Sequence, residues 1–302
     1  MRFTCLIPTF NNGAMIRASI ESVLAQTVRD LELFVVCDGA PPITHAIVDE
    51  FAAHDKRVKV FKFEKGERHG EASRHRALEE ATGDAVCYLS DDDYWFPDHL
   101  ETVAPLLAGV DFAHTRHTFI KPTFEFTAMD AQITDAETRR RMCAEKFNIF
   151  GPSVAGHWLS SYRRLPQGWA PAPLGVPTDL HMWRKWIGAG MRFAASAAVT
   201  TLHIPRATRG HQDSDTALRE TNFWRALMRD PIMRHALREL IPPDASPLPT
   251  AKVAARACEL HLRGGPAKAA ELERIHASRL WRYALPARRV WRRIRDALRL
   301  DA

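Results

Sequence analysis

One stretch of the chain, residues 85–100, joins an apolar run to three consecutive aspartates. Residues 85–89 have the length and character of a buried strand, and Asp91, Asp92 and Asp93 follow almost directly. Adjacent carboxylates repel one another, so a fold tolerates them where a cation lies among them. At the carboxyl end of a buried strand the usual cation is divalent with oxygen ligands, and it often holds substrate phosphates as well. The alternative is an acidic loop that caps a helix starting at Pro97.

Strand and helix patterns alternate at short intervals before and through this stretch. Strands are expected at residues 2–8, 31–37, 58–63 and 85–89, and helices at residues 16–24, 43–54 and 70–81. This alternation predicts an α/β fold with a doubly wound, mostly parallel sheet and helices on both faces. In such sheets ligands bind at the carboxyl ends of the strands. Polar features at residues 8–10, 38–39 and 91–93 fall at those ends, so we expect them to meet on one rim.

The turn after the first strand constrains how phosphates can be bound. A dinucleotide-binding domain needs a GxGxxG turn there, and this chain has Pro8-Thr9-Phe10-Asn11-Asn12-Gly13 instead. A P-loop is equally absent from the sequence. Phosphates must be held in another way, which again favours a metal.

Composition sets the broad class and the expected compartment. With 302 residues, 46% hydrophobic and 26% charged, the chain suits a soluble globular protein with one large α/β domain and an extension, or two small domains. No run of eighteen apolar residues occurs, and the N-terminus does not read as a signal peptide. Cys5, Cys37 and Cys87 lie in apolar runs and should be buried, and the absence of a CxxC pair suits a reducing cytoplasm.

The first hundred residues resemble the nucleotide-binding half of a family 2 glycosyltransferase with the GT-A fold. The matching segments occur in the family's order and spacing: CLIPTFNN, SVLAQT, LELFVVCDGA, HGEASRHRALEEATGD and YLSDDDYWFPDHL. The resemblance implies an inverting enzyme that moves a sugar from a nucleoside diphosphate to an acceptor hydroxyl with Mg²⁺ or Mn²⁺. We expect a catalytic domain over residues 1–212, divided into a nucleotide-binding half (1–108) and an acceptor-binding half (109–212), and a helical extension over residues 213–302.

The resemblance also implies roles for particular residues. Those expected at the nucleotide are Pro8, Thr9 and Phe10 at the base, Asp38 at a uracil edge, Arg74 near the diphosphate and Asp91 near the ribose. Asp92 matches the metal-binding acid of the DXD motif, with Asp93 as a second candidate ligand. The chain reads Ser90-Asp91-Asp92-Asp93 where the family often has Asp-Ser-Asp-Asp, so the division of these acids between ribose and metal stays open. Cys37 also stands where the family often has an acid.

For two of these residues, an ordinary structural role is the alternative to a binding role. Asp38 can accept a hydrogen bond from a ring N–H, which selects uracil or thymine over cytosine, but it is equally a turn residue before Gly39. Arg74 lies in an expected helix, where a solvated arginine is the ordinary reading. The resemblance favours the binding roles.

The expected acceptor-binding half follows. Residues 111–127 alternate apolar and polar side chains, which predicts a strand with one exposed face, a bend at Pro122 and a second strand. Residues 131–147 should be a charged helix. A loop at residues 151–153 leads to His157 and Trp158, which the resemblance places under the sugar as substrate candidates, although His157 also reads as a satisfied, half-buried histidine.

The predicted base follows a loop rich in proline and glycine at residues 168–177, expected over the site. Asp179 matches the family's catalytic base at the start of the next helix, where this chain has Thr-Asp in place of the common Glu-Asp. One carboxylate suffices to take the proton of the attacking hydroxyl. The alternative is that Thr178 or Asp179 caps that helix.

Further polar residues follow an expected strand at residues 191–204. The basic loop after it offers Arg206, Arg209 and His211 as substrate contacts at the diphosphate. His203 or His211 as a metal ligand is an alternative to a solvated loop histidine.

The last quarter of the chain differs in character. Residues 216–240 should be helical with a break at Pro231, residues 242–249 read as a linker, and residues 251–281 as a helical pair that suits a homodimer face or an appendage. Residues 286–300 place arginines on one arc and apolar residues on the other. This pattern suits an anionic membrane surface, or a helix docked on its own domain. No aromatic platform or nucleic-acid motif accompanies the arginines, so no nucleic acid is expected.

The sequence therefore predicts a cytoplasmic glycosyltransferase, peripheral on the inner face of the plasma membrane. It would transfer sugar from a UDP-sugar to a glycan or lipid-linked acceptor in polysaccharide biosynthesis, with Mn²⁺ or Mg²⁺ and Asp179 as general base. A nucleotidyltransferase is one alternative, but it would need a glycine-rich, basic first loop. A non-catalytic nucleotide-binding module is another, and the presence of Asp38, Asp92 and Asp179 argues against it.

Overall fold

The computed structural model describes residues 1–120, 126–128, 131–204 and 214–241. The chain divides into two compact units, one formed by Met1–His117 with Asp130–Thr201 and the other by Thr118–Met129 with Leu202–Ala302. The predicted linker, helical pair and basic segment from residue 242 onward lie outside the described residues, as does the predicted boundary at residues 212 and 213. The domain division, the dimer face and the membrane surface therefore stay predictions.

Four parallel strands form the centre of the first unit. They are β1 (Phe3–Thr9), β2 (Leu31–Asp38), β3 (Val58–Phe63) and β4 (Ala85–Tyr88), in the order β3-β2-β1-β4. All eight residues of β2 are buried, as its continuous apolar run predicts. Cys5, Cys37 and Cys87 are buried on these strands, which confirms that prediction. The expected strands are confirmed to within one residue at each end.

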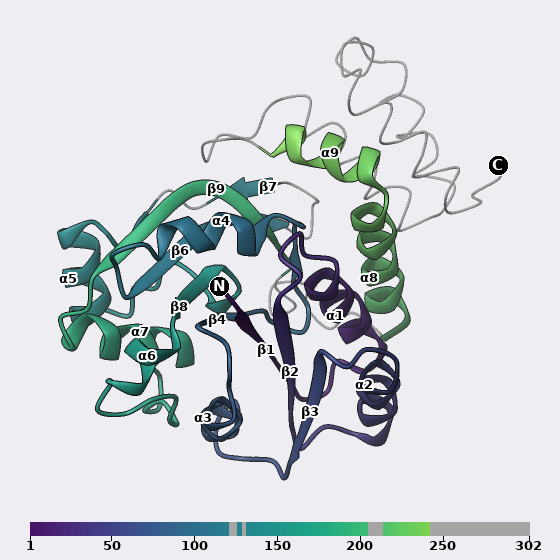
Figure 1. The fold of residues 1–302 in the computed structure, drawn as a ribbon, viewed down its shortest axis with the longest axis horizontal. Coiled ribbons are helices and arrows are strands. Elements are labelled where there is room, and N and C mark those ends of the chain that lie inside the picture. Colours follow the sequence, from purple (N-terminus) through teal and green to yellow (C-terminus); the bar gives the residue numbers. More distant parts are fainter. Residues whose placement is uncertain (121–125, 129–130, 205–213, 242–302) are drawn as a thin grey trace. The chain divides into compact units, whose positions relative to one another are not determined.

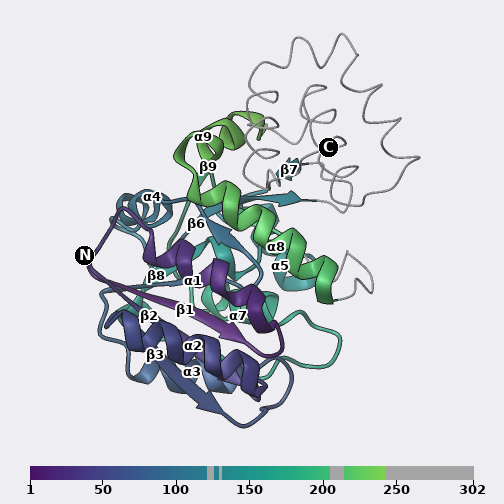
Figure 2. The same ribbon diagram turned by 90° about the vertical axis from the view of Figure 1, so that its right-hand side faces the viewer.

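Helices cover both faces of these strands. In Figure 1, α1 (Ile16–Leu24) and α2 (Pro42–His54) lie on one side, and α3 (Glu71–Glu79) lies on the other. The turned view in Figure 2 shows α2 running across β2 and β3. The 3-10 turn η1 (Gly13–Met15) leads into α1. The doubly wound arrangement of this half is as predicted.

Beyond β4 the sheet contains antiparallel pairings. The strands are β5 (Tyr94–Trp95), β6 (Phe112–Ile120), β7 (Phe126–Ala128), β8 (Ala155–Trp158) and β9 (Phe193–His203). The sheet continues from β4 in the order β8-β6-β9-β5, with β7 paired to β6. β8 is antiparallel to both β4 and β6. The sheet is therefore mixed, and the predicted parallel arrangement holds only for its first half.

The sequence analysis missed one of these later strands and mistook the surroundings of another. No strand was predicted at residues 155–158, which form β8 because they pair with β4 on one side and β6 on the other. The expected exposed face of the strand from residue 112 is also absent, since residues 112–117 are all buried. Inside the sheet the Oγ1 atoms of Thr115 and Thr200 lie 2.6 Å apart, within hydrogen-bond distance.

The remaining helices of the first unit pack beside these strands. They are α4 (His99–Leu106), α5 (Ala136–Ala144), η2 (Pro152–Val154), α6 (Leu159–Arg163) and α7 (Thr178–Gly188). α4 begins two residues after the predicted start at Pro97. In the second unit, α8 (Ser214–Arg229) and α9 (Pro231–Leu240) meet at Pro231, which confirms the predicted break. Within the described segments, every helix is too short or too polar to cross a bilayer.

A buried carboxylate ties the start of β2 to the turn before β4. Glu32 Oε1 accepts hydrogen bonds from Thr4 Oγ1 at 2.6 Å and from the N–H groups of Thr82 and Gly83 at 2.7 and 3.2 Å. Burial opposes ionisation of Glu32, but the hydrogen bonds outweigh it and hold its pKa below the ordinary value. Because the pKa is lower in the folded state, this stabilisation is present at neutral pH and is lost as the pH falls through the folded-state pKa.

Replacing Glu32 with alanine should lower the free energy of unfolding by about 2–3 kcal/mol, because buried donors lose their acceptor. Urea unfolding at neutral pH measures the change, and the difference from wild type should shrink in acid. Glu80→Ala is the matched control, since Glu80 makes only an exposed ion pair with Lys59 and should matter far less. Equal losses in the two variants would contradict the assignment.

Candidate functional site

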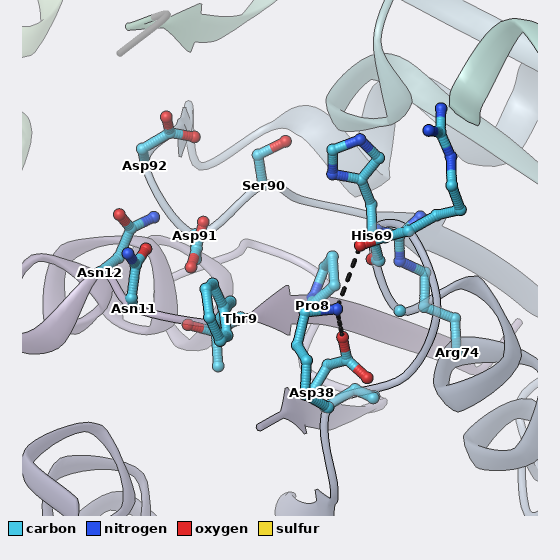
Figure 3. Close-up of a pocket in the computed structure, with 15 residues that line it drawn as sticks. Pro8, Thr9, Asn11, Asn12, Asp38, His69, Arg74, Ser90, Asp91 and Asp92 are labelled. Atoms are coloured by element: carbon cyan, nitrogen blue, oxygen red, sulfur yellow. Dashed lines mark hydrogen bonds and ion pairs between the residues drawn. The ribbon is translucent and has the colours of Figure 1, made fainter. Parts of the chain in front are cut away.

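A pocket of about 510 Å³ opens at the carboxyl ends of the parallel strands. Its walls come from the ends of β1 and β2, the loop between β3 and α3, and the segment after β4 (Figure 3). The lining residues are Pro8, Thr9, Phe10, Asn11, Asn12, Val36, Asp38, Lys65, Arg68, His69, Gly70, Arg74, Ser90, Asp91 and Asp92. The three polar features expected on one rim are therefore brought together. In Figure 3, Asp91 and Asp92 lie on the opposite side of the view from Arg74.

Asp38, at the end of β2, is held by three donors. Its Oδ1 accepts from Gly66 N at 2.9 Å and Ser73 Oγ at 2.9 Å, and its Oδ2 accepts from Lys65 Nζ at 2.7 Å. Burial opposes ionisation, but these hydrogen bonds outweigh it and hold the pKa of Asp38 below its ordinary value. Asp38 is therefore a fixed, charged acceptor on the pocket wall and more than a turn residue.

Lys65 is a pocket residue that the sequence analysis missed. Besides its ion pair with Asp38, its Nζ lies 5.5 Å from the centroid of the Phe10 ring. Phe10 is 45% exposed at the pocket, so its ring is available to a planar ligand. Lys65 lies two residues beyond β3, and the strand-end rule that identified Asp38 could have found it.

Gly70 allows the loop after β3 to approach Asp38. Its φ is +75°, and a Cβ at this position would lie 2.6 Å from Asp38 Cγ. Any other residue would therefore be strained and would also press against the carboxylate. This contact fixes the distance between the loop and the end of β2.

Arg74 is a buried arginine, and the solvated-arginine reading is wrong. It is 9% exposed, and its guanidinium carbon lies 4.9 Å from the centroid of the Trp169 ring. One guanidinium nitrogen donates to His69 O at 2.7 Å, while the buried Nε has no hydrogen-bond partner among the described residues. Burial lowers the pKa of Arg74 from its ordinary value. This cation on the pocket wall has donor capacity left for an anion.

Arg68 is a second pocket arginine that no sequence signal identified. It has a φ of +56°, an unusual conformation for a residue with a side chain. Its buried Nε likewise has no partner within the part of the chain that the structure describes. Strained backbone of this kind gathers at binding sites.

The three consecutive aspartates separate. Asp91 and Asp92 line the pocket, but Asp93 does not. Asp93 is 1% exposed, and its Oδ2 accepts from Ser153 Oγ at 2.6 Å. The hydrogen bond to Ser153 holds Asp93 inside the protein, away from the metal role predicted for it.

The residues present fit a metal ion that is bound together with a diphosphate. Among the described residues no group of three or more histidine, cysteine or acidic side chains could hold a metal by itself. Two neighbouring carboxylates, Asp91 and Asp92, nevertheless line the pocket. Mg²⁺ is commonly held by one or two carboxylates with substrate phosphates and water, and Mn²⁺ takes the same oxygen ligands.

Asp179 lies in the first turn of α7 and not at its cap. The N-cap is Pro177, without a side-chain cap, so the prediction that Thr178 or Asp179 caps the helix is wrong. Asp179 Oδ2 accepts from Asn148 Nδ2 at 2.7 Å, and Oδ1 accepts from Leu180 N at 2.9 Å. Burial outweighs these bonds and raises the pKa of Asp179 above its ordinary value. Asp179 is not among the lining residues, but the charge of Arg74 acts on it.

The other predicted substrate residues do not line this pocket. His157 is fully buried, with its Nε2 2.8 Å from Tyr88 Oη, and burial lowers its pKa to about 4. His157 is therefore a buried histidine with its hydrogen bonds satisfied, which was the alternative to a substrate contact. Trp158 donates from Nε1 to Leu107 O at 3.0 Å and packs against the core. In the second unit, the His203 ring meets Phe119 edge-on at 4.9 Å. Arg206, Arg209 and His211 lie outside the described residues.

Comparison with known families agrees with this geometry. The family described as glycosyl transferase family 2 matches residues 4–158, which include every residue lining the pocket and the parallel strands except Phe3 at the start of β1. The chain belongs to glycosyl transferase family 2.

Curated relatives match over shorter regions. The UDP-Glc:alpha-D-GlcNAc-diphosphoundecaprenol beta-1,3-glucosyltransferase WfgD of Escherichia coli is 36% identical over 98 residues, which cover 32% of this chain and 37% of the relative. The GalNAc(5)-diNAcBac-PP-undecaprenol beta-1,3-glucosyltransferase of Campylobacter jejuni is 28% identical over 113 residues, or 37% of this chain and 36% of the relative. The chain thus spans little more than a third of the length of these relatives.

Solved structures show the same fold. Staphylococcus aureus TarS 1–349 in complex with UDP-GlcNAc superposes with a TM-score of 0.53 at 17% identity, over 87% of this chain and 72% of that chain. The mannosyltransferase PcManGT from Pyrobaculum calidifontis, in complex with GDP-Man and Mn²⁺, gives a TM-score of 0.52 at 20% identity, over 95% and 85% of the two chains. The chain has the GT-A fold.

Proposed function

We propose that this protein is a glycosyltransferase that moves a sugar from a UDP-sugar to a hydroxyl of a glycan or lipid-linked acceptor, with inversion at the anomeric carbon. The observation that carries the proposal is the convergence of Asp38, Arg74 and the pair Asp91 and Asp92 on one pocket. Two neighbours support the choice of donor and acceptor: TarS binds UDP-GlcNAc, and the name of WfgD gives a UDP-Glc donor and a diphosphoundecaprenol acceptor.

The base end of the donor is assigned to Asp38 and Phe10. The Asp38 carboxylate, fixed by Lys65, Gly66 and Ser73, accepts the ring N–H of uracil. Phe10 offers an exposed ring face beside it. Cytosine has no ring N–H at the corresponding position and is selected against.

The diphosphate is assigned to Arg74 and Arg68, whose Nε groups have no partner among the described residues. Asp91 and Asp92 would hold Mg²⁺ or Mn²⁺, which when bound supplies positive charge that stabilises the departing nucleotide. Buried guanidinium groups bind phosphate oxygens strongly because water is excluded and the donor geometry is fixed.

Asp179 is assigned as the general base. Its raised pKa brings the carboxylate closer to the acceptor hydroxyl in basicity, which favours proton transfer as the hydroxyl attacks the anomeric carbon. Asn148 donates to one of its oxygens and fixes its orientation.

Titration calorimetry with UDP, GDP, dTDP and CDP, each with and without Mn²⁺, tests the assignment of the pocket. We expect UDP to bind most tightly and its affinity to depend on Mn²⁺. Asp92→Ala should remove that dependence, because it removes one of the two carboxylates proposed to hold the metal. Asp30→Ala is the control, since Asp30 is exposed and does not line the pocket. A preference for dTDP would change the donor, and the absence of metal-dependent binding for all four nucleotides would contradict the proposal.

A further inference from the structure

One buried carboxylate, that of Glu71, joins the nucleotide pocket to the helix that carries Asp179. Glu71 is the first residue of α3 and has no exposed surface. Its Oε2 accepts from His69 N at 2.9 Å, and its Oε1 accepts from Thr178 Oγ1 at 2.7 Å. Residues separated by more than a hundred positions in the sequence thus meet on a single side chain.

Glu71 is held as a charged group. Burial acts to raise its pKa, but the bonds from Thr178 and His69 and the nearby charge of Arg74 outweigh it and hold the pKa below the ordinary value. Both hydrogen bonds are therefore made to an ionised acceptor, which makes them stronger and geometrically stricter than neutral ones.

Both hydrogen-bond partners of Glu71 lie next to a group with a proposed function. On the pocket side, His69 lines the pocket, and its carbonyl accepts from the guanidinium of Arg74 at 2.7 Å. On the other side, Thr178 is the first residue of α7 and immediately precedes Asp179. Neither Glu71 nor Thr178 lines the pocket, so their contacts position other residues.

We propose that Glu71 and Thr178 form a positioning pair that holds Asp179 in register with the donor pocket. This inference rests on the proposed function, in which Asp179 is the base. The Thr178 hydroxyl fixes the start of α7 against α3, and the second oxygen of Glu71 fixes the loop that carries His69. A reacting group displaced by about 1 Å can cost about 100-fold in rate, so loss of the pair should appear mainly in kcat.

The test compares Thr178→Val with Thr178→Ser. Valine has the shape of threonine without the hydroxyl, whereas serine keeps the hydroxyl. We expect Thr178→Val to lower kcat by about 10- to 100-fold with little change in the Kd of UDP. Thr178→Ser should stay near the wild-type rate. Thermal unfolding of each variant separates loss of position from loss of fold.

Glu71→Ala provides a second arm of the test. It removes the acceptor for His69 as well as for Thr178, so it should lower kcat and also weaken UDP binding. Thr178→Val should add little to a chain that already carries Glu71→Ala, because both changes break the same contact. The proposed positioning pair would be wrong if Thr178→Val and Thr178→Ser had equal kcat. It would also be wrong if the effects of Thr178→Val and Glu71→Ala on kcat were fully additive.

Asp179→Asn separates failure of the positioning pair from failure of the proposed base. If Asp179→Asn is slow while Thr178→Val turns over at the wild-type rate, the positioning pair is wrong and the base assignment stands. If Asp179→Asn itself turns over at the wild-type rate, the proposed base is wrong and the pair has no base to position.

Discussion

Replacing Asp179 with asparagine should lower kcat by about 10²- to 10⁴-fold, the usual contribution of a general base. Asparagine has nearly the same shape and still carries an oxygen that can accept from Leu180 N, so the start of α7 should keep its structure. Asp179 does not line the pocket, and the Kd of UDP should change little. Steady-state transfer assays and calorimetry on the same preparation measure the two quantities.

The pH dependence of the transfer rate provides an independent test of Asp179 as the base. Burial raises the pKa of Asp179 above its ordinary value, and a base must be ionised to accept a proton. The rate should therefore fall as the pH drops through this raised pKa, at a pH above the ordinary range of aspartate. The residual rate of Asp179→Asn should lack this acid limb. Asp30→Asn, at an exposed position, should retain both the rate and the limb. An unchanged acid limb in Asp179→Asn would assign it to another group.

The parallel half of the fold could be predicted because its signals are local. In β2 the segment Leu33–Cys37 is continuously apolar and is followed by Asp38, which suits a strand buried on both faces. Once the strands are known to be parallel, their carboxyl ends meet on one rim. The gathering of Asp38, Asp91 and Asp92 around one pocket follows from that rule.

The antiparallel half could not be predicted in the same way, because its structure depends on pairings between distant residues. β8 is a strand because His157 lies opposite Val86 on one side and Phe112 on the other. Four residues carry too weak a local pattern to show this. The alternation in β6 suggested an exposed face, but the strand lies inside the sheet, where Thr115 meets Thr200.

The contacts around Asp179 could not be predicted either, because they also join residues that are distant in the sequence. Asn148 lies 31 positions away in the sequence and occurs in no recognisable motif, yet it donates to the carboxylate. Glu71 and Thr178 are more than a hundred positions apart. A hydrogen bond between side chains on separate loops and helices leaves no periodic signal, so only the folded chain reveals it.

Replacing Arg74 with methionine should lower both the affinity for UDP and the free energy of unfolding. The Kd of UDP should rise about 100-fold, because hydrogen bonds from a cation to a charged group contribute about 1.5–3 kcal/mol. The free energy of unfolding should also fall, by about 1–3 kcal/mol, because His69 O loses its donor and the buried Glu71 carboxylate loses a nearby positive charge. Calorimetry and urea unfolding measure the two effects.

Uridine and Arg74→Lys make this prediction specific. Uridine lacks the diphosphate, so wild type and Arg74→Met should bind it with nearly the same affinity. Arg74→Met should bind UDP much more weakly than wild type does. Lysine keeps the charge but lacks the planar fork that stacks on Trp169 and donates to His69 O. Arg74→Lys should therefore recover only part of the UDP affinity. If Arg74→Met weakens uridine and UDP equally, Arg74 shapes the pocket and does not bind the diphosphate, and the phosphates must then be held by Arg68 and the metal.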